Sequence, residues 1–357
     1  MTMKLLISLI VTIYFSLFCS LVNAAENVFY LLHASSPKQI QTLAATLSKI
    51  RENHQSIQIL ISQAYRVNKK GDVTGFINDE LSQVTKAYSI KLMAMVTNAG
   101  FEPSIAHQFL SSPSAQAKAI ESILAACKEH NLYGVQFDFE GISIQDKYLL
   151  TRFYQHAAYA LHKEGYKISF AIIPAFKKEM YHSVFLRKTY KNWSGVYDLK
   201  ALSEIADFIT LMAYNQHPDG TIPGPTASAD YTEAAITNAL QNIPAEKLSL
   251  GIPAYSVYWF SGHSTVSLHN IEISYADANS IIKRNHGDLF WNKKYKINYS
   301  VYEHNWLNEY VYLEDVDSFK AKLALAKKFN LRGISVFRIG TEDDRIWALL
   351  SNHSYIS

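Results

Sequence analysis

The feature that most constrains the fold of this chain is the alternation of short apolar runs with longer amphipathic ones. Strands that alternate with helices pair in parallel, and eight such units close into a barrel. The sequence therefore predicts a (β/α)8 TIM barrel, in which the link between the second and third strands is the least regular. The eight strand-like runs are Val28–Leu32, Ile57–Ser62, Lys91–Val96, Val135–Glu140, Ile168–Ile173, Phe208–Tyr214, Leu248–Ile252 and Gly333–Arg338. The helix-like runs include Lys38–Ile50, Ser114–His130, Gln145–Lys163, Tyr231–Gln241 and Val316–Phe329.

An open, doubly wound sheet is the competing fold for such an alternation. Its usual purpose is nucleotide binding, which needs a glycine-rich phosphate loop after the first strand. No such loop follows Val28–Leu32. This absence favours the closed barrel.

The stretch between the seventh and eighth predicted strands is too long for a plain loop. It runs from Tyr255 to Asp315 and contains alternating fragments such as Lys296–Val301 and Glu309–Leu313. We expect residues 255–315 to form a small α+β insertion over the mouth of the barrel. Residues 25–254 and 316–357 then make up the barrel itself.

The first 24 residues have the pattern of a secretory signal. Lys4 precedes an apolar run from Leu5 to Leu21, and small residues lead up to Ala25. An uncleaved anchor is the alternative, but the run falls at or below the roughly 18–20 residues that a spanning helix needs. We expect a cleaved leader (residues 1–24), a secreted or periplasmic location and no membrane in the mature form.

Composition limits the classes of molecule that the mature chain is expected to bind. The formal charge of +3 becomes +2 once Lys4 is removed, and no basic run interleaved with aromatic residues is present, so nucleic acid is an unexpected partner. The 23 Tyr, 18 Phe and 5 Trp suit stacking on sugar rings, although aromatic residues are also ordinary core material. Cys127, the one cysteine outside the leader, lies at helical spacing from apolar residues and is predicted to be a core residue.

Polar residues alternate with apolar ones in the run Tyr133-Gly134-Val135-Gln136-Phe137-Asp138-Phe139-Glu140. A crossover strand in an α/β fold is covered on both faces, so polar residues on it need a reason. Gln136, Asp138 and Glu140 share one side. We expect them to point into the barrel, with Gln136 in contact with the substrate and Glu140 at the carboxyl end of the strand, where the catalytic groups of such barrels lie.

The same run resembles the Asp-Gly-x-Asp-x-Asp-x-Glu signature of family 18 glycoside hydrolases, the chitinase-like enzymes. Asp138 and Glu140 occupy its last two acidic positions and Gly134 its glycine, while Tyr133 and Gln136 stand where the first two aspartates would be. The likeness is greatest to the branch of bacterial spore-cortex-lytic N-acetylglucosaminidases, whose motif reads Asp-Phe-Glu and often carries an amide before it.

The resemblance implies a substrate-assisted mechanism. Two carboxylates on one side of one strand cannot flank a sugar ring as ordinary retaining or inverting glycosidases require. In this family the 2-acetamido oxygen of N-acetylglucosamine attacks the anomeric carbon instead. Glu140 would be the acid and later the base, while Asp138 would orient the acetamido N–H and stabilise the oxazolinium cation.

Further likeness spans most of the mature chain and implies the remaining site residues. In Met-x-Tyr of the sixth strand, Tyr214 would hydrogen-bond the acetamido carbonyl and Met212 would line the subsite, with Asn215 beside them. By position, Asn98 and Tyr255 would border the sugar pocket. Phe337 takes the place of the family's usual tryptophan and keeps a stacking face but loses the indole donor. Taken singly, each could also be a structural residue at a strand end.

No cofactor or metal is expected. The 13 histidines show no compact metal-ligand spacing, and a Ser-His-Asp hydrolase would need a Gly-x-Ser-x-Gly elbow that the sequence lacks. The predicted function is a secreted glycosidase, acting as a monomer on β-linked N-acetylglucosamine in a peptidoglycan-type or chitin-type polymer. The alternatives are a plain chitinase and a catalytically silent, lectin-like sugar-binding protein on the same barrel.

Overall fold

The computed structural model describes residues 26–32, 37–176, 184–261, 268–304 and 306–351. The predicted leader lies outside these ranges. Within them, no helix combines the length and the apolar character that a bilayer crossing demands.

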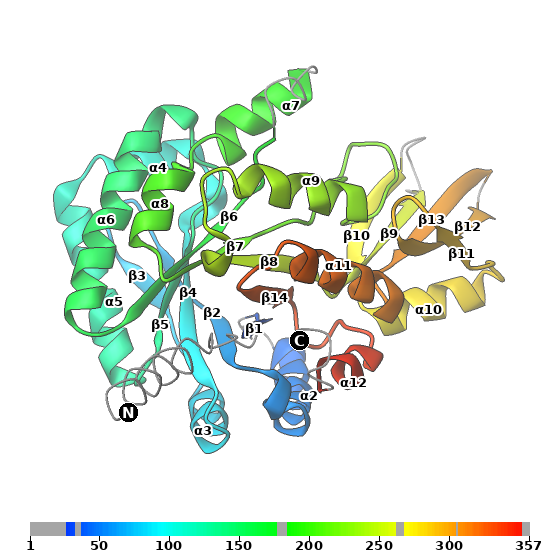
Figure 1. The fold of residues 1–357 in the computed structure, drawn as a ribbon, viewed down its shortest axis with the longest axis horizontal. Coiled ribbons are helices and arrows are strands. Elements are labelled where there is room, and N and C mark those ends of the chain that lie inside the picture. Colours follow the sequence, from blue (N-terminus) through cyan, green and yellow to red (C-terminus); the bar gives the residue numbers. More distant parts are fainter. Residues whose placement is uncertain (1–25, 33–36, 177–183, 262–267, 305, 352–357) are drawn as a thin grey trace, which may run out of the picture.

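Eight parallel strands close into a barrel (Figure 1). Each strand pairs with its neighbours in chain order, and β1 pairs both with β2 and with β14, which closes the ring. The predicted (β/α)8 TIM barrel is thereby confirmed. The barrel strands are β1 (Glu26–Leu31), β2 (Ile59–Val67), β4 (Lys91–Asn98), β5 (Gly134–Asp138), β6 (Lys167–Ile172), β7 (Phe208–Leu211), β8 (Leu248–Pro253) and β14 (Gly333–Phe337).

Helices cover the outside of this barrel. The principal ones are α2 (Pro37–Glu52), α3 (Asp79–Ala87), α5 (Pro113–Glu129), α6 (Lys147–Lys163), α8 (Leu199–Ile205), α9 (Ala229–Ala239), α11 (Val316–Lys328) and α12 (Arg345–Ser351). Shorter pieces are α4 (Pro103–Leu110), α7 (Val184–Thr189), the π-turn η5 (Tyr190–Ser194), and the 3₁₀ turns η1 (His54–Ser56), η2 (Ala99–Phe101), η3 (Ile144–Asp146) and η6 (Ala245–Lys247).

Several of these elements were not predicted from the sequence. The irregular link between the second and third barrel strands contains β3 (Val73–Gly75), which pairs antiparallel with β2, and then α3. α4, α7, α8 and α12 were also not predicted. All four are eight residues long or shorter, so each offers about two turns or fewer of helical periodicity to recognise.

Local capping explains where the helices begin. Ser112 accepts a hydrogen bond from the Ala115 N–H and precedes Pro113, which suits the first helical position of α5. The Asp315 side chain accepts hydrogen bonds from two backbone N–H groups of α11. The Ser318 hydroxyl accepts one from the Asp315 N–H, which completes a capping box.

The two faces of each barrel strand have different environments. Along β5 and the residue after it, Val135, Phe137 and Phe139 are fully buried against the surrounding helices. Phe137 and Phe139 pack edge to face with each other, and both pack against Phe153 of α6. This aromatic packing holds β5 against the helical layer, so the intervening polar residues of β5 must point into the barrel.

A second sheet lies beside the barrel, next to α9 and α11 (Figure 1). It occupies the chain between β8 and α11, and its five antiparallel strands are ordered β10-β9-β13-β12-β11. α10 packs on one face through Ala278, Ile281 and Ile282. The elements are β9 (Ser256–Ser261), β10 (Leu268–Ile273), α10 (Tyr275–Arg284), β11 (Phe290–Asn292), β12 (Ile297–His304) and β13 (Leu307–Leu313).

Two strand ends differ from the sequence-based boundaries in a way that affects the site. β5 ends at Asp138, so Glu140 lies two residues beyond the strand and not within it. β7 ends at Leu211, which places Met212 and Tyr214 on the chain that leaves the barrel. Apolar alternation continues past both strand ends, whereas the regular strand pairing does not, although the Met212 N–H still donates to the Ile172 carbonyl oxygen (2.9 Å).

Candidate active site

Asp138 and Glu140 lie together at the carboxyl end of β5. The last residue pair between β4 and β5 is Thr97 with Asp138, so Asp138 is still held by the ladder. Its side chain is only 6% exposed, and its Oδ1 atom is buried without a hydrogen-bond partner in the described part of the chain. A buried acceptor of this kind is costly unless a ligand completes it.

The two carboxyl groups shift each other's pKa. Burial raises the pKa of Asp138 to about 7, and a hydrogen bond with Glu140 lowers it in part. Burial also raises the pKa of Glu140 well above its ordinary value, and both the charge of Asp138 and the hydrogen bond to it raise it further. The pair therefore retains a proton at neutral pH, and that proton resides on Glu140.

The backbone around Glu140 is held from two other elements. The Asn98 side chain, at the end of β4, donates to the Glu140 carbonyl oxygen (2.8 Å) and accepts from the Glu140 N–H (2.9 Å). Tyr197 donates its hydroxyl to the Phe139 carbonyl (2.9 Å). Asn98 was predicted to border the sugar pocket. In the structure its side-chain amide hydrogen-bonds the Glu140 backbone.

Gln136 lies deeper in the barrel and is completely buried. Its Oε1 atom accepts from the Tyr30 hydroxyl (2.8 Å), while its Nε2 atom donates to Ser169 (2.9 Å) and Thr210 (3.2 Å). Thr210 in turn pairs with Ser335 (3.0 Å). The Gln136 amide thus forms its hydrogen bonds with other residues of the protein. We therefore assign Gln136 to the floor beneath Asp138 and not to a sugar contact.

Tyrosines surround the two acids. Tyr30, Tyr197 and Tyr214 each have a raised pKa because of burial first, with the charge of Asp138 as a further cause. Glu140 contributes in the same direction for Tyr197 and Tyr214. These phenols are therefore neutral at any physiological pH and able to donate O–H hydrogen bonds.

Phe337, at the end of β14, is the centre of an aromatic wall. Its ring centroid lies 5.7 Å from Tyr30, 5.7 Å from Tyr214 and 6.2 Å from Tyr255. The Tyr214 ring is nearly parallel to it, at 20°, whereas the Tyr255 ring is edge-on at 81°. A partly buried ring in such a wall can still offer one face to a sugar.

Tyr255 is 1% exposed, and its hydroxyl is fully occupied. It donates to the Asn215 side chain and accepts from Thr226 (3.1 Å). Thr226 also accepts from the Asn215 N–H (3.3 Å). Tyr255 therefore fixes the loop that follows Tyr214, and of this group only Asn215 is exposed, with its side-chain oxygen held by Tyr255.

Met212 and Tyr214 lie against Gly251 of β8. A Cβ atom at Gly251 would lie 2.4 Å from the Leu211 carbonyl oxygen and 3.0 Å from the Tyr214 ring. Met212 is 9% exposed, as expected of a wall residue. The glycine is thus required for the close approach of β8 to the chain that carries Tyr214.

Two residues at the site were missed by the sequence analysis. Tyr30 follows the alternation of the first strand, so its inward direction could have been predicted. Tyr197 lies between η5 and α8, outside any strand, and reaches Phe139 from 58 residues away. No periodic signal marks it. Cys127, by contrast, is completely buried as predicted, and burial raises the pKa of its thiol to about 12.

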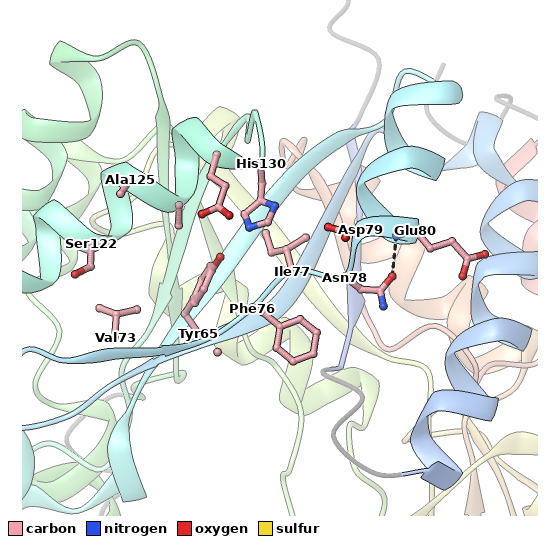
Figure 2. A pocket seen from close by; sticks show the side chains of 13 residues that line it. Tyr65, Val73, Phe76, Ile77, Asn78, Asp79, Glu80, Ser122, Ala125 and His130 are labelled. Atoms are coloured by element: carbon pink, nitrogen blue, oxygen red, sulfur yellow. Dashed lines mark hydrogen bonds between the residues drawn. The ribbon is translucent and has the colours of Figure 1, made fainter.

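A cavity lies elsewhere, on the flank of the barrel (Figure 2). It has a volume of about 790 Å³ and lies between β3, the start of α3 and the end of α5. Tyr65, Phe76, Asn78 and His130 are among its lining residues, and Asn78 caps α3 (Figure 2). The described residues contain no group of three or more His, Cys, Asp or Glu side chains placed to bind a metal ion.

A family model described as Glycosyl hydrolases family 18 matches residues 28–342. The chain belongs to this family. As a family 18 protein it is a glycosidase, and its substrate is a carbohydrate. Asp138 and Glu140, which lie at the carboxyl end of a barrel strand, both fall within the matched segment.

Known relatives of this family 18 chain include two proteins of Bacillus subtilis (strain 168). The glycosylase YvbX is 24% identical over 310 residues, which cover 85% of this chain and 86% of YvbX. A cortical fragment-lytic enzyme is 24% identical over 307 residues, which cover 85% of this chain and 69% of that enzyme. The structure of a chitinase from Chromobacterium violaceum ATCC 12472 superimposes with a TM-score of 0.78 at 23% identity, covering 92% of this chain and 99% of the chitinase.

Proposed function

We propose that this family 18 protein is a secreted enzyme that cleaves β-linked N-acetylglucosamine in a peptidoglycan-type polymer by substrate-assisted, retaining catalysis. Glu140 protonates the leaving oxygen and later activates water. Asp138 accepts a hydrogen bond from the acetamido N–H, and Tyr214 donates one to the acetamido oxygen. The acetamido oxygen itself attacks the anomeric carbon, so the intermediate is an oxazolinium ion and not an ester of the protein.

The observation that carries this proposal is the buried, unpartnered Oδ1 of Asp138. An acetamido N–H would complete this acceptor, and the same contact would orient the acetamido oxygen towards the anomeric carbon. Asp138 and Glu140 adjoin at one strand end, and each shifts the pKa of the other. Such a pair provides an acid but no nucleophile on the opposite face of the sugar, which supports assistance by the substrate.

Peptidoglycan is favoured over chitin because the relatives that cover most of this chain include a cortical fragment-lytic enzyme. The likeness to the solved chitinase structure, at 23% identity, supports the fold only. Secretion is supported by the sequence of the first 24 residues, with their apolar run and small residues before Ala25. An extracellular site of action suits a wall polymer.

The test is mass spectrometry of the products released from purified peptidoglycan and from chitin oligomers. We expect new reducing ends at N-acetylglucosamine from peptidoglycan, and slower release from chitin. Faster release from chitin would make the protein a chitinase, and binding of both polymers without hydrolysis would make it a lectin-like protein.

Substrate assistance by the acetamido group has a separate test. A matched substrate with free glucosamine in place of N-acetylglucosamine lacks the attacking oxygen and should be inert. A thiazoline mimic of the bicyclic intermediate should bind at least ~10²-fold more tightly than substrate, as transition-state analogues do. Equal hydrolysis of the deacetylated substrate, or a trapped sugar ester on an Asp or Glu, would contradict substrate assistance.

A further inference from the structure

We infer that Asn98 is a positioning residue, whose side-chain amide continues the β4–β5 ladder past its last backbone pair and thereby sets the place of the Glu140 acid. The inference rests on the proposed function for its catalytic consequence. Its structural part can be tested without any substrate.

The register of the two strands shows why a side chain is needed here. The backbone pairing of β4 with β5 ends at Thr97 and Asp138. Glu140 lies two residues further along, beyond the end of β5. Without another constraint, the backbone that carries the acid would be a free strand end. Loop positions of this kind are held less well than strand positions.

The Asn98 amide supplies the missing ladder bonds. A side-chain amide has one carbonyl acceptor and an N–H donor, as a peptide group has. Both are directed at one residue, because the amide donates to the Glu140 carbonyl at 2.8 Å and accepts from the Glu140 N–H at 2.9 Å. Asn98 is itself 3% exposed, on a strand that also pairs with β2 through Val67. The anchor is therefore rigid.

Tyr197 completes the support one peptide earlier. Its hydroxyl donates to the Phe139 carbonyl at 2.9 Å, and its ring is 4% exposed. The acid is thus held on both sides, by β4 through Asn98 and by the segment before α8 through Tyr197. Asn98 makes two bonds to Glu140 itself, and its amide adds no net charge beside an acid that must keep its proton.

The experiment compares Asn98→Ala with Asn78→Ala. Asn78 is a matched control, because its side chain also makes two backbone hydrogen bonds, from the N–H groups of Glu80 and Leu81, but does so at the start of α3 on the barrel flank (Figure 2). We expect Asn98→Ala to lower the hydrogen-exchange protection of the Glu140 amide at least ~10-fold. We expect kcat to fall by about 10- to 100-fold with KM little changed, since a misplaced group costs about this much.

The Asn98→Asp variant distinguishes the positioning of Glu140 from a general contribution of Asn98 to folding. One carboxylate oxygen still accepts from the Glu140 N–H, but the other can no longer donate to the Glu140 carbonyl, so the protection of that amide should be rescued in part. The new charge would join Asp138 as an anion near Glu140, with Tyr197 and Tyr214 as the neutral neighbours, and should raise the pKa of Glu140. The alkaline limb of the pH–rate profile should then move to higher pH.

Two results would contradict the positioning role of Asn98. Unchanged protection of the Glu140 amide in Asn98→Ala would overturn it, and so would a loss of kcat equal to that of Asn78→Ala. If the wild-type protein hydrolyses no polymer, the proposed function fails, while the exchange measurement still decides whether Asn98 holds the Glu140 backbone.

Discussion

The Tyr214 ring stacks on the Phe337 ring, with the centroids 5.7 Å apart and the planes 20° apart. Gly251 bounds the Tyr214 ring from β8, where a Cβ atom would come within 3.0 Å of the ring. The direction of the Tyr214 hydroxyl is therefore determined by two neighbouring barrel strands. A phenol held in this way can be aimed at a substrate group without reorganisation.

We predict that Gly251→Ala displaces Tyr214 and lowers turnover at least ~10-fold. The added methyl group would also meet the Leu211 carbonyl oxygen at 2.4 Å, so the free energy of unfolding should fall by about 1–3 kcal/mol. Gly165→Ala is the control, because its φ of 83° imposes backbone strain but an added Cβ there meets nothing within 4 Å. Equal activity of the two variants in a hydrolysis assay would argue against the role of Tyr214.

We predict that Glu140→Gln abolishes most turnover and leaves the fold intact. The amide keeps the shape of the side chain but cannot deliver a proton, which costs about 10²- to 10⁴-fold. Circular dichroism and melting would establish that the variant is folded. A folded variant with near-normal turnover would disprove the assignment of Glu140 as the acid.

We predict that Asp138→Asn and Tyr214→Phe both lower kcat and that their effects are not additive. Both groups are proposed to hold the same acetamido group, and Asp138 contributes to the raised pKa of Tyr214. Residues coupled through one ligand group show interaction energies of roughly 0.5–3 kcal/mol. A double-mutant cycle on kcat/KM measures this value, and strict additivity would indicate that the two residues act at separate places.

We predict that the Asp138–Glu140 pair makes stability fall as pH rises from about 4 to about 7. The pKa of Asp138 is about 7 in the folded protein against an ordinary 3.8, and that of Glu140 is raised in the same direction. Between these values the folded protein keeps protons that the unfolded chain releases, so a rise in pH favours unfolding.

The measurement for this pair is the melting temperature against pH, for wild type and for a double variant with Asp138→Asn and Glu140→Gln. The neutral double variant should gain on the wild type across that pH range and keep gaining until Glu140 has also lost its proton in the folded protein, after which its advantage is constant. Parallel curves would show that the pKa values of the two acids are not raised in the folded state.

The sequence was sufficient for the architecture and for the central pair of acids. Apolar runs at strand spacing, separated by amphipathic helices, leave few ways to bury both faces of a parallel sheet, and the barrel is one of them. Alternation along Val135–Glu140 also placed Asp138 and Glu140 on one side, because side-chain direction in extended chain depends only on local geometry.

Tertiary structure decided what those residues touch. Gln136 was predicted to face the substrate, but its amide binds Tyr30, Ser169 and Thr210 from three other barrel strands. Which side chains meet inside a barrel depends on the register between strands and on the direction of each pleat. A one-residue change in register would exchange these partners, and nothing within a single strand determines it.

The same reason explains Asn98 and Tyr197. Periodicity along the chain shows that Asn98 ends a strand, but the Glu140 backbone lies 42 residues away and Tyr197 reaches Phe139 across 58. The raised pKa values of Asp138 and Glu140 also depend on burial by neighbours from distant elements. The amino-acid sequence thus determined which acids share a strand end, while packing between strands decided how they are held and which of them keeps the proton.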